Sequence, residues 1–254
     1  MSIEPSNQYA LTVLQCGRTV GRFKPLSRID GLVHCVTTKR GELFPPIASE
    51  GADAFKRLAC DMQMPAVAWA EQVHDNTVLA VDSAGCAGQA DGLVTATPGL
   101  LLLGRSADCP LILAADPVRK IAGFAHASWR ATIKKITVRL IDVFRELGSN
   151  PNDIVACICP SAGPEKFEVG PEVFRQAVAE LGPDAKNFFL AGKGDKKFFD
   201  LWAANDSQLQ SAGVDFMNVY SARVCTISNV ETYPSYRVEG SAAQRFAATI
   251  GWKN

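Results

Sequence analysis

Residues 100–130 read LLLLGRSADCPLILAADPVRKIAGFAHASWR, three short apolar runs separated by turn residues. Runs of this length between turn residues are typical of buried strands, so we expect strands at 100–104, 109–115 and 120–126. Asp116 and Pro117 predict a turn before the third strand, because proline presets the turn dihedral and aspartate bonds the main chain ahead of it. The segment therefore predicts adjacent antiparallel strands at the centre of the fold.

The register of this hairpin depends on the length of its loop. With Pro117 and Val118 as the two tip residues, Cys109 lies opposite His126, with Cβ atoms about 5 Å apart. A loop one residue longer would shift the pairing by one position. The first register also gives two apolar pairs beside the cysteine, Leu111 with Phe124 and Leu113 with Ala122.

The rest of the chain alternates strand-like and helix-like segments. Ser128 is a suitable N-cap for a helix over about 129–147, where apolar residues recur at helical spacing, and Gly148 suits the position after its last turn. Further segments follow the same alternation: strands at 32–38, 154–158 and 219–225, and helices at 171–181 and 201–212. This order predicts a mixed α/β (α+β) fold, which we expect to form one domain over 1–254.

Composition narrows the class of protein. Lysine plus arginine and aspartate plus glutamate both number 26, so the formal net charge is zero, which argues against nucleic acid or an anionic membrane as the main partner. The apolar runs are too short to span a bilayer. The start MSIEPSNQYA has no apolar stretch after a charged region, so we expect a cytoplasmic protein. Its eight cysteines are then expected as reduced thiols or metal ligands.

The chain has only three histidines, His34, His74 and His126. His34 lies in a strand-like run and is predicted to be structural. His74 and His126 together with Cys109 match a known ligand set of catalytic zinc, which leaves a fourth position open and lowers the pKa of water bound there towards 7. Their spacing alone equally permits a core thiol beside a satisfied histidine.

Several blocks in a fixed order carry a resemblance to a known family. They are Glu71–His74 (EQVH), Ala90–Thr95 (ADGLVT), Ser106–Pro110 (SADCP), Ala125–Arg130 (AHASWR), Cys159–Pro164 (CPSAGP), Phe167–Gly170 (FEVG), Asp200–Trp202 (DLW) and Ser235–Arg237 (SYR). With this set the chain resembles the YfiH family, formerly called multicopper polyphenol oxidases or laccase-domain proteins and now regarded as purine nucleoside phosphorylases. The resemblance runs over most of the chain.

The resemblance implies a layered fold of mixed β-sheets flanked by helices. It implies a zinc ion, rather than copper, held by His74, Cys109 and His126. It also implies phosphorolysis of adenosine, inosine and S-methyl-5'-thioadenosine, with adenosine deamination as a side activity. Nucleoside and phosphate would be the partners of a monomer or small homo-oligomer. The chain departs from the family pattern at Ser128 and Ala131, and at Lys39, which stands where the family has an arginine.

Phosphorolysis requires cations for phosphate, and arginine binds two phosphate oxygens at once. We expect substrate contacts from Arg130, near a helix N-terminus that favours anions, and from Arg237, Lys39 and Gln72. Deamination would need a carboxylate to move a proton, and strand alternation turns Asp108 away from the site.

Other functions remain open from the residues. Cys109 and His126 also suit a Cys-His hydrolase, for example one that edits a cell-wall precursor. A copper-dependent polyphenol oxidase would use the same ligands, but three histidines are too few for a laccase copper cluster. A binding module without catalysis is the third alternative, against which the open metal position argues.

Overall fold

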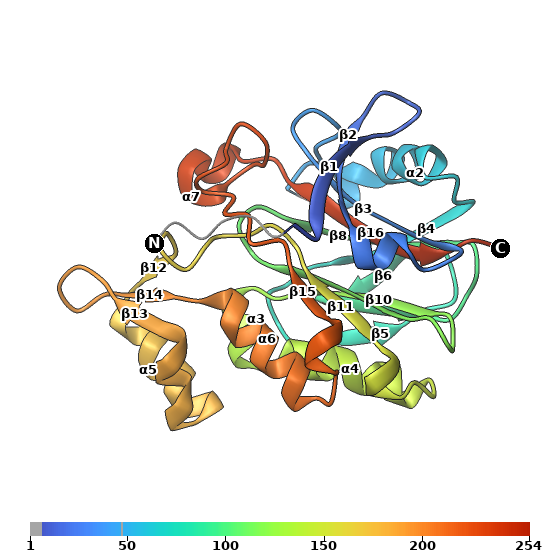
Figure 1. Cartoon of the computed structure of the whole chain (residues 1–254). Helices are drawn as coiled ribbons and strands as arrows, with labels where there is room; N and C mark the ends of the chain where they lie inside the picture. The colour runs from blue at the N-terminus through green and yellow to red at the C-terminus, as the bar shows by residue number, and fades with distance from the viewer. Residues whose placement is uncertain (1–6, 47) are drawn as a thin grey trace.

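The computed structural model describes residues 7–46 and 48–254. Two large mixed sheets pack face to face, with helices on their outer faces (Figure 1). The seven-stranded sheet has the strand order β1 (Tyr9–Val13), β2 (Thr19–Phe23), β3 (Leu32–Thr37), β16 (Phe246–Trp252), β8 (Leu100–Ser106), β4 (Ala66–Glu71), β6 (Gly85–Gln89). The six-stranded sheet has the order β15 (Val219–Ser221), β11 (Val155–Ile158), β9 (Leu111–Asp116), β10 (Ile121–His126), β7 (Gly92–Thr95), β5 (Val78–Ala80). Both sheets contain parallel and antiparallel pairs, so the predicted mixed α/β class is confirmed.

A small antiparallel sheet stands beside these layers, in the order β12 (Glu168–Val169), β14 (Lys197–Phe199), β13 (Phe189–Ala191). The α-helices are α1 (Lys24–Ser27), α2 (Ala52–Asp61), α3 (Trp129–Ile133), α4 (Ile136–Glu146), α5 (Pro171–Leu181), α6 (Leu201–Ser211) and α7 (Tyr236–Glu239). Short 3-10 helices lie between α-helices and strands: η1 (Ala48–Gly51), η2 (Pro151–Asp153), η3 (Pro183–Phe188), η4 (Phe216–Asn218), η5 (Gly240–Ala242).

The hydrophobic core has three layers: one between the two large sheets and one on the outer face of each sheet. In β8, Leu100 and Leu102 face the six-stranded sheet, whereas Leu101 and Leu103 face α2. The other face of the six-stranded sheet packs against α4 and α6. The two sheets approach closely at Gly104, where an added Cβ would lie 2.5 Å from the Phe124 ring. A larger residue there would therefore separate the sheets.

The predicted register of the central hairpin is wrong by two positions. His126 pairs with Leu111 and Phe124 with Leu113, because the loop consists of the four residues 117–120. The Asp116 carboxylate accepts the N–H groups of Val118 and Arg119, which stabilises this wider turn. Cys109 consequently lies before β9 and not opposite His126. An even shift leaves each side chain on its predicted face, so the apolar face between the sheets is unchanged.

The single helix predicted over 129–147 is two helices, α3 and α4. Ser128 caps α3 as predicted, its hydroxyl accepting the Ala131 N–H. The chain then breaks at Lys135, whose φ of 62° is left-handed. Side-chain amides take the carbonyls at the break: Gln208 donates to Thr132 O and Asn76 to Lys134 O. Tertiary contacts thus interrupt a helical sequence pattern.

Other boundaries agree more closely with the expectations. The helix predicted at 171–181 is α5, and the one at 201–212 is α6 with one residue fewer. The strand expected at 219–225 ends at Ser221. Within the described residues, no helix is long and apolar enough to cross a membrane.

Candidate metal centre

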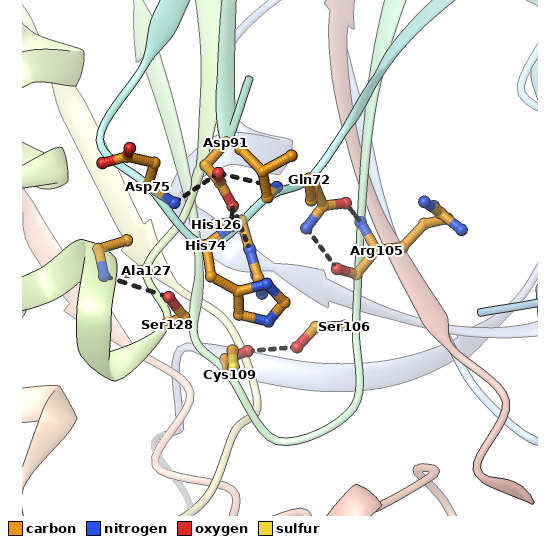
Figure 2. Close-up of polar contacts among 12 residues, drawn as sticks. Gln72, His74, Asp75, Asp91, Arg105, Ser106, Cys109, His126, Ala127 and Ser128 are labelled. Atoms are coloured by element: carbon orange, nitrogen blue, oxygen red, sulfur yellow. Dashed lines mark hydrogen bonds and ion pairs between the residues drawn. The ribbon is translucent and has the colours of Figure 1, made fainter. Parts of the chain in front are cut away.

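Three segments that are distant in sequence bring His74, Cys109 and His126 together (Figure 2). His74 lies in the loop after β4, Cys109 in the connection between β8 and β9, and His126 at the end of β10. Their donor atoms all lie within 4.8 Å of one another, and the two imidazole rings meet edge to face with centroids 5.0 Å apart. His126 is buried, Cys109 half-buried and His74 exposed, so the group opens to solvent on one side.

The buried carboxylate of Asp91 organises both histidines. Its Oδ1 lies 2.8 Å from His126 Nδ1 and accepts the His74 N–H at 3.0 Å. Its Oδ2 accepts the N–H groups of Val73 and Asp75. These bonds hold His74 at a left-handed φ of 63°, a conformation that a non-glycine residue keeps only when its surroundings fix it. Because Nδ1 of His126 is occupied, its Nε2 is left for the cluster.

Electrostatics favour a thiolate at Cys109. Burial raises the pKa of this thiol, but the hydrogen bonds and charge of His126 and His74 outweigh burial and lower the pKa to about 7. Burial lowers the pKa of His126, whereas its bonds to Asp91 and Cys109 raise it to about 9. For Asp91, burial acts to raise the pKa, and the His126 contact leaves the pKa below its usual value. The thiolate is the form of cysteine that binds metals and attacks carbon.

Asp108 connects the cysteine to the C-terminal part of the chain. Its carboxylate accepts hydrogen bonds from the Thr226 hydroxyl at 2.6 Å, the Ser235 hydroxyl at 3.0 Å and the Arg237 N–H at 2.7 Å. Its φ of 89° shows that the strand is not regular here, so the alternation argument does not hold at this residue. Asp108 lines the cavity, but its carboxylate is occupied by these three donors.

The group opens into a cavity of about 650 Å³, a size typical of small-molecule sites. Arg130, Arg237 and Gln72, which the sequence predicts to contact substrate, line this cavity. Arg130 stacks on Trp129 and Arg237 on Phe167, with the guanidinium carbons 4.3 and 5.1 Å from the ring centroids.

Lys39 and Gln72, both predicted to contact substrate, make contacts within the protein. Lys39 is absent from the described residues that line the cavity; its Nζ pairs with Glu239 at 2.6 Å. Gln72 lies beyond the end of β4. Its side-chain amide donates a hydrogen bond to the Arg105 carbonyl and accepts one from the Arg105 N–H. The helix argument for Arg130 also weakens, because α3 has only five residues.

Sequence reasoning missed three residues that shape the site. Asp91 stood in a recognised block without an assigned role. Arg105 and Arg245 both line the cavity, yet neither was expected there. Arg105 could have been noticed from its position directly after the apolar run 100–104. An arginine in a buried strand needs a partner, because arginine is rarely buried without one.

The donor set fits zinc on chemical grounds. Two imidazoles and one thiolate are the protein ligands of one catalytic zinc class, with an open position for water or substrate. Nδ1 of His126 contacts the Asp91 carboxylate. Metal-binding histidines usually make such a hydrogen bond through the ring nitrogen that does not bind the metal. Among the described residues, His74, Cys109 and His126 form a group that could hold a metal ion.

Residues 49–253 match the family model described as multi-copper polyphenol oxidoreductase laccase. A purine nucleoside phosphorylase of Deinococcus radiodurans is 36% identical over 181 residues, which cover 71% of this chain and 68% of the relative. The purine nucleoside phosphorylase YfiH of Escherichia coli K12 is 32% identical over 184 residues, covering 72% of this chain and 73% of the relative.

This chain belongs to the YfiH, or laccase-domain, family.

Solved structures of the YfiH family share the fold described above. A Bacillus licheniformis protein designated hypothetical protein YfiH superposes with a TM-score of 0.84 at 25% identity, covering 98% of this chain and 100% of the other. YlmD from Geobacillus stearothermophilus has a TM-score of 0.82 at 26% identity, covering 92% of this chain and 96% of the other. The predicted YfiH-like layers are thus confirmed.

Proposed function

We propose that this YfiH-family protein is a zinc-dependent purine nucleoside phosphorylase that acts on adenosine, inosine and S-methyl-5'-thioadenosine, with adenosine deamination as a side activity. One observation carries the proposal. A single cavity combines the His-Cys-His group with four arginines and aromatic surfaces. Relatives at 32 to 36% identity that carry the name purine nucleoside phosphorylase support the reaction class.

The cavity supplies the surfaces that a nucleoside needs. Trp129, Phe167 and Tyr236 line it, and flat aromatic faces suit the planar purine base. Arg130 and Arg237 stack on two of these rings, so a nucleoside in this cavity would have positive charge beside it. In phosphorolysis a phosphate oxygen bonds to the sugar carbon as the bond to the base nitrogen breaks, and the base leaves with a proton. Guanidinium groups hold the phosphate close to that carbon and reduce the repulsion on its approach.

His74, Cys109 and His126 would hold the zinc ion. When bound, zinc would act as a Lewis acid that activates water or polarises the base. Asp91 fixes the orientation and tautomer of the His126 ring and the main chain of His74, so that both residues are positioned for the ion. Asp108 holds the segment next to Cys109 against the C-terminal residues that carry Arg237.

A laccase reaction is not the proposal, although the family model carries that name. The third histidine, His34, is buried in β3 and its Nε2 accepts the Phe23 N–H at 2.9 Å, away from the His-Cys-His group. One such group can hold one ion, whereas a laccase requires a cluster with many imidazoles.

A Cys-His hydrolase is the second candidate, favoured by the chain of contacts from Asp91 through His126 to Cys109. Nucleophile, base and orienting carboxylate stand in this order in cysteine hydrolases. The two candidates differ in their need for metal. A metal-free protein that retains full activity after chelation would favour the hydrolase.

The test measures metal and products in the same preparation. Protein purified without an affinity-metal column should contain about one zinc per chain, and Cys109→Ala should lose it, while the exposed-thiol control Cys60→Ser keeps it. Wild type should release adenine from adenosine only with phosphate, and inosine without phosphate. Absence of both products from zinc-loaded protein would reject the proposal.

A further inference from the structure

Arg105 and Arg245 come from opposite parts of the chain and meet on one face of the seven-stranded sheet. Arg105 in β8 pairs with Ala247 in β16, and Arg245 lies two residues before Ala247. Extended pairing continues to Arg245, which exchanges both main-chain hydrogen bonds with Phe44. Residues two apart on a strand share a face, so the two arginine side chains are neighbours. Both line the cavity of the His-Cys-His group.

Neither guanidinium has a carboxylate partner in the described residues 7–46 and 48–254. Arg105 donates through Nη1 to the carbonyls of Pro45 and Pro46, at 2.9 and 3.2 Å, and Pro46 also lines the cavity. Arg245 donates to the carbonyls of Ala243 and Gln244.

Burial makes this arrangement unusual. Arg105 is only 6% exposed, and a buried charge is costly unless an opposite charge compensates it. Burial lowers the pKa of Arg105, the charge of Glu71 raises it and the nearby Arg245 lowers it, which together give a pKa of about 10, so the group stays charged at neutral pH. Arg105 also lies over the Phe55 ring and Arg245 over the Tyr236 ring, 5.6 and 6.0 Å from the ring centroids. Carbonyl oxygens and aromatic rings do not neutralise the two cations, so positive charge remains in the lining of the cavity.

We propose that Arg105 and Arg245 form a subsite for a phosphate group beside the His-Cys-His group. Two guanidinium groups offer paired N–H donors that match phosphate oxygens. The same chemistry would accept inorganic phosphate or a phosphate monoester. The assignment of this subsite to the phosphate consumed in phosphorolysis rests on the proposed function. The binding of an anion to the two arginines can be tested without any turnover.

The other cations at the cavity are less suited to this role. Arg130 is exposed and covers the Trp129 ring, so water and salt screen its charge. Arg237 donates through Nη1 to the Glu168 carbonyl and packs on Phe167. A charge in a buried setting attracts an anion more strongly than one in water, which favours the buried Arg105 and, to a smaller extent, the half-buried Arg245.

The test is calorimetric titration of the full-length, zinc-loaded protein with inorganic phosphate, with AMP and with adenosine. Arg105→Gln and Arg245→Gln should each weaken phosphate binding by about 10- to 100-fold. Adenosine binding should stay close to that of wild type. Arg139→Gln is the matched control, because Arg139 lies on the exposed face of α4 and pairs with Glu146. Thermal unfolding and zinc content verify that each variant is folded.

If Arg105→Gln does not fold, Arg105→Lys replaces it, since lysine keeps the charge but loses the forked donors. AMP binding that exceeds phosphate binding, and falls in the same variants, identifies a phosphate ester as the occupant. Phosphate binding without AMP binding identifies the free ion. The subsite is overturned if folded Arg245→Gln and the folded Arg105 variant both bind phosphate with wild-type affinity. It is also overturned if phosphate binding is lost when zinc is removed but not when either arginine is replaced.

The outcomes also separate the subsite from the proposed function. Phosphate binding that depends on both arginines, in a wild type that releases no adenine, supports the subsite and rejects phosphorolysis. Phosphate-dependent adenine release with an unchanged KM for phosphate in the variants rejects the subsite and leaves phosphorolysis standing.

Discussion

The Asp91 carboxylate lies 2.8 Å from Nδ1 of His126, and the same oxygen accepts the main-chain N–H of His74. One buried side chain therefore positions both histidines of the candidate metal centre, although they belong to different strands and loops. This relationship links the packing of the six-stranded sheet to the chemistry of the cavity, because Asp91 directly precedes β7.

Replacement of Asp91 tests this link. Asp91→Asn keeps the shape but removes the charge, so we expect zinc affinity to fall about 10- to 100-fold, as for other partners of metal-binding histidines. Competition with a chelator measures the affinity. The surface variant Asp142→Asn, which loses only a pair with Arg145, should bind zinc like wild type. Unchanged affinity in folded Asp91→Asn would show that Asp91 serves the loop alone.

Asp108 is expected to contribute to stability through its three donors. Asp108→Asn weakens charge-assisted hydrogen bonds in a buried setting and should lower the free energy of unfolding by about 2 to 3 kcal/mol. Thr226→Val removes one donor and should cost about 1 kcal/mol. Urea denaturation measures both. A loss for Asp108→Asn no greater than that for Thr226→Val would contradict the network.

The exposed Arg130 and the paired Lys39 should behave differently. Arg130→Ala should raise the KM for nucleoside or phosphate by about threefold, the size expected of a screened surface charge, with zinc content unchanged. Lys39→Ala should leave both KM values unchanged, because Lys39 is tied to Glu239 away from the cavity lining. Steady-state kinetics distinguish the two, and a larger effect at Lys39 would restore its predicted substrate contact.

His34 should make stability depend on pH. Burial lowers the pKa of His34 from 6.5 to about 3. As the pH falls below 6.5 the unfolded chain binds a proton that the folded chain rejects, so folding becomes less favourable by up to about 1.4 kcal/mol per pH unit. The contribution is fully present above pH 6.5. Urea denaturation at pH 7, 6 and 5 should therefore show a steeper loss for wild type than for His34→Gln. Parallel losses would contradict the buried neutral state.

The candidate metal ligands were predictable from the sequence because short blocks around His74, Cys109 and His126 keep a recognisable order. The element types were predictable where a local pattern decides them, as in α5, whose apolar spacing and flanking Pro171 and Gly182 fix both ends. The hairpin register was not, because the carboxylate of Asp116 selects a four-residue turn that the sequence permits but does not require.

The sequence by itself determined the alternation of buried strands and amphipathic helices, since these depend on residues close together in the chain. It also singled out the three residues of the candidate metal centre. Only the tertiary structure decided that α3 and α4 separate at Lys135, since the side-chain amides that bind the carbonyls of Thr132 and Lys134 at the break come from Gln208 and Asn76. It alone brought Arg105 beside Arg245, because the pairing of β8 with the last strand joins residues that no local pattern connects.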